Sequence, residues 1–195
     1  MNLQLLKSKS IYFQALVCLL GTVISLQVNA GAGGGGFAFH LPLEFRTRNV
    51  SVNGGGATTT QYLNVVPSFG YQYTETLYVG ANYRYTNETG STSFKGGVYG
   101  PSLGFTASSI NITIAYYLGG SLTESTSGSE TIYLNGTGPE FSMAYLFPAS
   151  GNFAWGPQFM YSDIKYTSTQ SGGNTTSSTY EISGIEPYIG LFFYF

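Results

Sequence analysis

The sequence contains one cysteine and very few charged residues. Its single cysteine, Cys18, lies in an apolar stretch near the N-terminus. The rest of the chain can therefore form no disulfide, thiolate metal site or cysteine nucleophile. Charged residues make up 8% of the chain, against about 25% in an ordinary soluble domain. This scarcity favours a protein whose outer surface contacts lipid rather than water.

The chain also lacks any concentration of basic residues. Its formal net charge is −2, and without residues 1–30 five Lys or Arg remain against nine Asp or Glu, which gives −4. A nucleic-acid partner is therefore not expected. His40 is the only histidine, and a lone histidine without cysteines predicts no zinc site. We expect no metal and no cofactor.

The N-terminal stretch is typical of a secretory signal peptide. Two lysines precede an apolar segment over residues 11–20, and Ala30 is the small residue that a signal peptidase reads. We expect cleavage before Gly31, a signal peptide over residues 1–30 and a single domain over residues 31–195. An uncleaved membrane anchor is the alternative, but polar residues interrupt the apolar segment.

Apolar residues alternate with small or polar residues in eight segments after the glycine-rich lead. Such a period of two is the mark of a strand with two different faces, and the segment lengths suit transmembrane strands. The sequence therefore predicts an all-β fold, an eight-stranded antiparallel up-and-down transmembrane β-barrel. The segments span residues 37–46, 62–72, 77–85, 99–106, 110–119, 139–147, 153–162 and 185–195.

The connections between these segments alternate between short and long. The long ones are rich in Gly, Ser, Thr and Asn, which predicts flexible extracellular loops opposite short periplasmic turns, with both termini in the periplasm. The predicted loops cover residues 49–60, 87–97, 121–136 and 163–183, and the predicted turns residues 72–76, 107–109 and 148–152.

Prolines occupy outward positions in five predicted strands. A proline cannot donate to the ladder of hydrogen bonds and is disfavoured in a central strand. The pattern predicts bulges or weak pairing at that level. These prolines are Pro67, Pro101, Pro139, Pro157 and Pro187.

The last eight residues carry the most specific motif. Tyr188, Gly190, Phe193 and the terminal Phe195 occupy the positions of a sequence that resembles the C-terminal recognition signal of Gram-negative outer-membrane barrels. The last strand of a soluble sandwich is the alternative. With the strand pattern, the motif makes residues 31–195 resemble the small eight-stranded barrels of the OmpA/OmpX-like group.

This resemblance implies a location and partners. It implies a monomer in the bacterial outer membrane, in contact with outer-membrane lipid and lipopolysaccharide. It also implies delivery by periplasmic chaperones and insertion by the barrel-assembly machinery.

Charged residues fall on the inward phase of the predicted strands at comparable heights. Unpaired charges in a narrow lumen are costly, so we expect them to pair across it. An eight-stranded barrel is only wide enough for side chains to fill, so this cluster predicts a polar plug, with a gate or proton-linked channel as the alternative. The cluster comprises Glu44, Arg46, Arg84, Glu140 and Glu186.

Function is less sharply defined than fold. The polar loops favour a structural or surface-interaction role, in adhesion or envelope integrity, for an unidentified ligand. A narrow porin-like channel for small solutes is the alternative. A barrel enzyme that modifies lipid A is disfavoured, because His40 is predicted near the periplasmic end and no acid–base motif flanks it.

Overall fold

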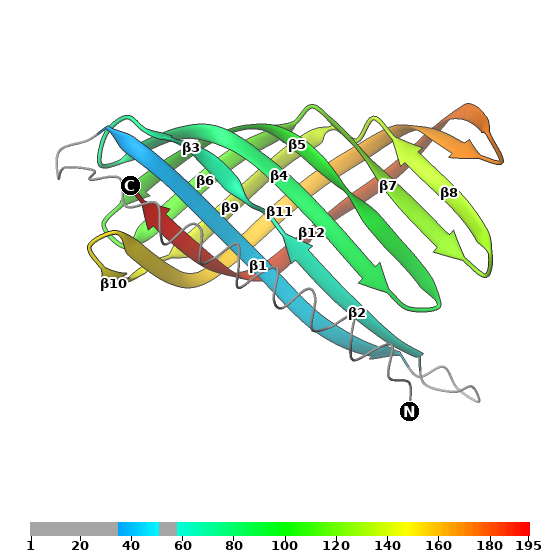
Figure 1. Ribbon diagram of the computed structural model, residues 1–195, viewed down its shortest axis with the longest axis horizontal. Helices are drawn as coiled ribbons and strands as arrows, with labels where there is room; N and C mark the ends of the chain where they lie inside the picture. Colours follow the sequence, from blue (N-terminus) through cyan, green and yellow to red (C-terminus); the bar gives the residue numbers. More distant parts are fainter. Residues whose placement is uncertain (1–34, 51–57) are drawn as a thin grey trace.

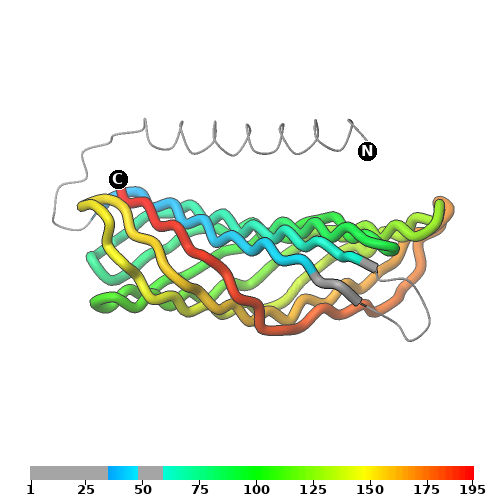
Figure 2. The backbone as a smooth tube through the Cα atoms, turned by 90° about the horizontal axis from the view of Figure 1, so that it is seen from below, coloured from blue at the N-terminus to red at the C-terminus, as the bar shows by residue number. Residues whose placement is uncertain are grey.

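In a computed structural model that describes residues 35–50 and 58–195, antiparallel strands close into a barrel (Figures 1 and 2). The predicted signal peptide, residues 1–30, and Cys18 lie outside the described residues. The strands are β1 (Gly36–Val50), β2 (Thr58–Val65), β3 (Ser68–Gln72), β4 (Leu77–Thr89), β5 (Thr92–Ala107), β6 (Ile110–Tyr117), β7 (Gly119–Thr126), β8 (Ser129–Leu134), β9 (Gly138–Tyr145), β10 (Phe147–Ser150), β11 (Phe153–Ser171) and β12 (Asn174–Tyr194).

Several of these strands are consecutive pieces of one crossing of the wall. The pieces β2 and β3 both pair with β1 and β4, β6 and β7 both pair with β5, and β8, β9 and β10 all pair with β11. The described residues thus make eight antiparallel crossings. β1 pairs with β12 from Ala38↔Tyr194 to Leu43↔Ile189, which closes the ring. The predicted eight-stranded antiparallel barrel is confirmed.

The predicted alternation of faces is also confirmed. Side chains on one phase are buried in the barrel, such as Tyr78 and Arg84 on β4 and Gln158 on β11. Those on the other phase form an apolar outer band. This band ends sharply on β11 and β12, where the pair Tyr161↔Ile185 is followed by Asp163↔Ser183 and Lys165↔Glu181. Exposed members of the band include Phe69, Val79, Tyr83, Tyr99, Leu103, Phe105, Ile114, Met143, Phe159 and Ile189.

The segments predicted to be long flexible loops are largely strands, so that prediction is wrong. β4 runs to Thr89 and β5 starts at Thr92, β7 and β8 are separated by two residues, and β11 and β12 likewise. The wall therefore continues beyond the apolar band as hairpins, which project to the right in Figure 1. We call this side the hairpin end and the side with Phe195 the terminal end. The predicted loop 49–60 lies partly outside the described residues.

Two features explain why these polar segments form hairpins. The turns at Ser127-Gly128 and Gly172-Gly173 have positive φ at both residues, as two-residue type I′ turns require. Inward aromatic rings then pack between the hairpins, where Tyr133 stacks on Tyr180 with ring centroids 4.0 Å apart. Ring packing of this kind adds about 0.5–1.5 kcal/mol per pair beyond burial.

The tyrosine at the centre of this packing also has a polar partner. The hydroxyl of Tyr133 donates to the carboxylate of Glu124. Burial first, and then this hydrogen bond, raise the pKa of Tyr133 to about 12. The hydroxyl therefore remains a donor at neutral pH, and the hairpin β7–β8 is held by both contacts.

The prolines coincide with interruptions of the ladder. Pro67 stands between β2 and β3. Pro101 lies opposite the break between β6 and β7, because Ser102 pairs with Ala115 and Tyr99 with Gly119. By the same reasoning Pro157 faces the break between β9 and β10. The N–H that each of these three prolines lacks would have faced a neighbouring strand that is already irregular. The predicted weak pairing therefore consists of local interruptions of the ladder.

Pro187 marks the end of the closing ladder. The backbone N–H of Phe195 donates to the carbonyl of Phe37, 2.8 Å away. In an antiparallel pair every second residue faces the same neighbour, so Ile189 and Pro187 also face β1. Ile189 is in the last pair with β1, and the next position that faces β1 is Pro187, which has no N–H to donate.

Within residues 35–50 and 58–195, no helix is long and apolar enough to cross a membrane.

Deletion of Phe193–Phe195 is expected to prevent assembly, because it removes the start of the ladder between β12 and β1. The measurement is heat-modifiable migration of membrane fractions on a gel. A matched control removes Ser171 and Asn174, one pair beside the hairpin turn, and should leave a folded band. Equal folded fractions in both variants would contradict the assigned role of the closing ladder.

Candidate functional site

An ionic layer crosses the barrel interior at mid-height. Arg84 on β4 pairs with Glu140 on β9, at 3.1 Å from Nη1 to Oε2, and with Glu186 on β12. The side chains of Arg84 and Glu140 are 5% and 2% exposed. One guanidinium therefore joins three crossings of the wall.

Tyrosine and amide groups complete the hydrogen bonds of this layer. Tyr117 donates to Glu140 at 2.7 Å, Tyr188 donates to Glu186 at 2.8 Å, and Asn82 approaches Glu140 at 3.4 Å. These donors supply partners that buried carboxylates need in place of water. Without these donors, Arg84 would be left alone to satisfy two carboxylates, whose oxygens can accept more hydrogen bonds than one guanidinium supplies.

The other two predicted cluster residues form a neighbouring pair. Glu44 accepts a hydrogen bond from Asn64 at 2.6 Å and lies 3.3 Å from Nε of Arg46. The guanidinium of Arg46 covers the ring of Tyr62, 4.3 Å from its centroid. The side chain of Arg46 is 48% exposed. The five predicted residues are therefore divided between a triad around the buried Arg84 and a pair that joins the buried Glu44 to the half-exposed Arg46.

His40 lies among aromatic rings. It is buried, and its ring packs against Tyr78 and Phe192 with centroids 4.6 and 4.7 Å away. Its Nε2 atom has no hydrogen-bond partner among the described residues. The ring is thus part of the aromatic filling near the terminal end, and among the described residues no carboxylate or hydroxyl binds its Nε2 atom for acid–base work.

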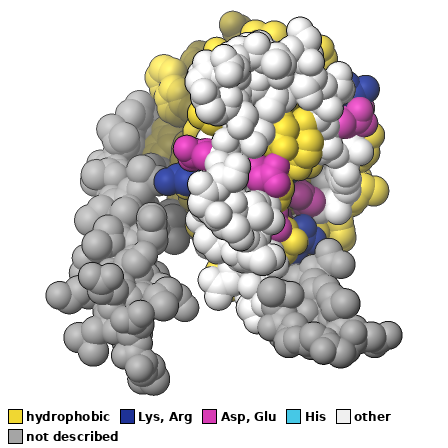
Figure 3. Space-filling view, turned by 90° about the vertical axis from the view of Figure 1, so that its right-hand side faces the viewer, with side chains coloured by type: hydrophobic (Ala, Val, Ile, Leu, Met, Phe, Trp, Pro, Cys, Tyr) yellow, Lys and Arg dark blue, Asp and Glu magenta, His cyan; other side chains and the backbone are white. Residues whose placement is uncertain are grey.

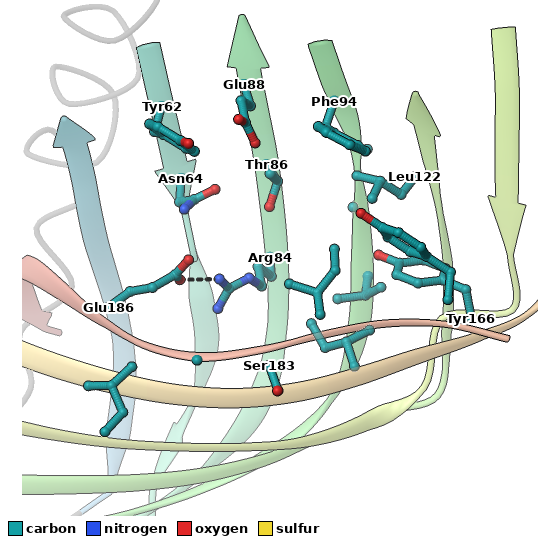
Figure 4. Close-up of a pocket in the computed structure, with 18 of the residues that line it drawn as sticks. Tyr62, Asn64, Arg84, Thr86, Glu88, Phe94, Leu122, Tyr166, Ser183 and Glu186 are labelled. Atoms are coloured by element: carbon teal, nitrogen blue, oxygen red, sulfur yellow. Dashed lines mark hydrogen bonds and ion pairs between the residues drawn. The ribbon is translucent and has the colours of Figure 1, made fainter. Parts of the chain in front are cut away.

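A cavity of about 310 Å³ lies between the ionic layer and the hairpins (Figure 4). Arg84 and Glu186 form its floor, and Thr86 and Glu88 line one side. The opposite side is apolar. Its apolar lining comprises Phe94, Val98, Leu122, Ile164, Tyr166, Tyr180 and Ile182.

A second cavity of about 210 Å³ opens at the terminal end, lined by residues that include Gln72, Glu75 and Tyr194. It shares no lining residue with the cavity at the hairpin end. Between the two, the interior is filled by side chains that are at most 3% exposed. These are Tyr78, Tyr117, Met160, Tyr188 and Phe192.

No group of three or more His, Cys, Asp or Glu side chains within the described part of the chain could hold a metal ion. The ionic layer combines carboxylates with a guanidinium, which fits a charge-neutralising network rather than a cation cage.

Sequence reasoning missed the apolar lining of the larger cavity. Composition predicts a flexible loop over residues 163–183, which include Ile164 and Tyr166 on β11 and Tyr180 and Ile182 on β12. They alternate with polar residues, and the pairs Ile164↔Ile182 and Tyr166↔Tyr180 continue the inward phase of both strands. This short period of two was the available signal.

The similarity of this chain to known proteins is one of three-dimensional structure. No family model and no curated protein matches the chain. Among solved structures, Neisserial surface protein A has 16% identity and a TM-score of 0.48, over 83% of this chain and 99% of that one. The translocator domain of the autotransporter NalP from Neisseria meningitidis has 14% identity and a TM-score of 0.39, over 95% of this chain and 70% of that one. The closed ladder described above defines the fold independently of both.

Replacement of Arg84 by Met is expected to lower the free energy of unfolding by about 3–5 kcal/mol, because the buried Glu140 and the partly buried Glu186 then lose their cation. The measurement is denaturant unfolding in lipid, followed by fluorescence of Trp155, the only tryptophan. Adding Glu140→Gln and Glu186→Gln should recover part of the loss.

An exposed ion pair provides the control, since the side chains of Lys165 and Glu181 are 52% and 45% exposed. Lys165→Met should cost only about 0–1 kcal/mol, as is usual for exposed ion pairs. Equal losses for Arg84→Met and Lys165→Met would show that the triad is not the stabilising unit.

Proposed function

We propose that the protein is a non-conducting outer-membrane barrel that presents rigid polar hairpins to the cell exterior for surface interaction. The apolar band supports membrane insertion, because a wall of exposed Phe, Tyr, Ile and Leu meets the requirement of lipid. The observation that carries the surface role is the continuation of the strands beyond this band into aromatic-packed hairpins.

The hairpins are suited to recognition rather than to chemistry. Figure 3, viewed from the hairpin end, shows mostly polar and backbone surface there, with acidic groups, a few basic groups and some apolar surface. Recognition commonly resides in segments held by a rigid scaffold. The isolated ring of His40 and the paired carboxylates support a function without catalysis.

Filling of the lumen supports a non-conducting barrel over the alternative of a narrow channel. The two cavities are separated by the ionic layer and by five deeply buried side chains. Permeation would require Tyr188 or Phe192 to leave this packing.

In planar bilayers the purified protein is expected to give no steady conductance. Replacing both Tyr188 and Phe192 by Ala removes filling beneath the ionic layer and should produce measurable current. A large, stable, ion-selective current from the unmodified protein would instead favour the porin-like channel.

Trimming the hairpin β7–β8 is expected to abolish attachment of expressing cells to matrix-coated surfaces. The variant replaces residues 124–131 by Asn-Gly, which keeps Thr123↔Ile132 as the last pair. A matched variant trims the hairpin β11–β12 at Ser171 and Asn174. Heat-modifiable migration must be retained in both. Unchanged attachment in both variants, with the barrel folded, would contradict the surface role.

A further inference from the structure

The wall of the barrel has a gap on the hairpin side of its closing ladder. β1 and β12 pair only up to Leu43↔Ile189. Beyond that point β1 pairs with β2 alone and β12 with β11 alone, among the residues that the structure describes. Figure 2 shows the two strands separating toward the hairpin end. We call this gap the seam.

The seam begins within the apolar outer band. Phe45 on one side and Ile185 on the other are both 72% exposed, and Ile185 is the last apolar outward residue of β12 before Ser183. The part of the seam nearest the closing ladder is therefore level with the edge of the lipid. A hydrocarbon chain in the outer leaflet would meet the seam at this height.

The cavity at the hairpin end extends to the seam. Its lining includes Ser183, Gly184 and Ile185, which lie consecutively along the free edge of β12, and Arg46 on the β1 side. A Cβ atom added to Gly184 would meet no other atom within 4 Å. Gly184 is on the inward phase of β12, so the cavity is open in front of this part of the strand. The unpaired stretch between β1 and β12 therefore lies between the outer wall and the lining of the cavity.

The side chains that line this cavity indicate which part of an amphiphilic molecule would fit inside it. Val98, Leu122 and Ile164 are at most 3% exposed and offer an apolar surface. The charged groups near the cavity are mostly carboxylates, since Glu44, Glu88, Glu140 and Glu186 outnumber Arg46 and Arg84. An anionic head group would be repelled there, whereas an uncharged chain gains from the burial.

We propose that this cavity binds the single apolar chain of a neutral or zwitterionic amphiphile, which enters through the seam while the head group stays at the membrane surface. The cavity volume of about 310 Å³ is at the lower limit of small-molecule sites, about 300–1,000 Å³, and suits one chain. The proposal rests on the outer-membrane placement proposed above.

Tryptophan quenching tests the site in bilayers that contain phosphatidylcholine with brominated acyl chains. In a Trp155→Phe background, Ile182→Trp reports from the cavity lining and Phe192→Trp from the filled interior of the same strand. The Ile182→Trp reporter is expected to lose most of its emission, and the Phe192→Trp reporter to keep it. Equal quenching, or none in either, overturns the proposal.

The native Trp155 separates failure of the site from failure of the membrane placement. This side chain is 43% exposed on the outer band, so brominated chains must quench it if the barrel lies in the bilayer. Quenching of Trp155 without quenching of Ile182→Trp rejects the cavity site alone. Absence of both rejects the membrane placement.

A second arm identifies the source of the chain. Ordinary bilayers receive 11-bromoundecanol from the aqueous side, and quenching of the Ile182→Trp reporter is followed again. Quenching in both arms supports entry from the leaflet, and quenching by the alcohol alone overturns entry through the seam while retaining the chain-binding site.

Blocking the space beside the seam provides the matched control. Gly184→Leu fills open space and should remove most of the quenching of Ile182→Trp by brominated lipid. Thr179→Leu, an exposed position on the same strand that does not line the cavity, should leave it unchanged. Equal effects of the two substitutions overturn the proposed route.

Discussion

The ladder between β1 and β12 is the constraint on which the rest of the barrel depends. A backbone group in hydrocarbon has no water to bind, so a membrane-spanning sheet must close on itself. Here closure begins with the hydrogen bond from Phe195 to Phe37 and continues to the pair Leu43↔Ile189. Pro187 then removes the next donor. Among the described residues, the barrel is consequently closed at the terminal end, and β1 and β12 are unpaired with each other toward the hairpin end.

The ionic layer divides this barrel into halves with different interiors. Toward the terminal end, aromatic rings around His40 and Phe192 fill the lumen. Toward the hairpin end, apolar side chains line a cavity whose floor is Arg84 and Glu186. Because removal of one partner would leave a buried charge, the layer holds β4, β9 and β12 in fixed relation. It thereby sets the shape of the cavity as well as the closure of the lumen.

The wall was predictable from sequence, but the hairpins and the choice of partners within the ionic layer were not. The period of two identifies each crossing, because the two faces of a strand meet different surroundings. Composition misled at residues 163–183, where abundant Ser, Thr and Gly outweighed the alternation that places Ile164 and Tyr180 inside. The choice of Glu140 and Glu186 as partners of Arg84 depends on the stagger between strands, which no single strand encodes.

The seam concentrates three properties at one place in the wall. Unpaired strand edges are tolerated at membrane depth only where they are buried in protein or border a water-filled space. The unpaired edge of β12 begins at Pro187 and soon passes Ile185, the last apolar outward residue, so most of it lies outside the apolar band. Ser183 and Gly184 on this edge line the cavity. Ile185, like Phe45 on β1, is exposed on the outer surface. The proline that interrupts closure therefore adjoins residues of both the cavity lining and the apolar outer surface.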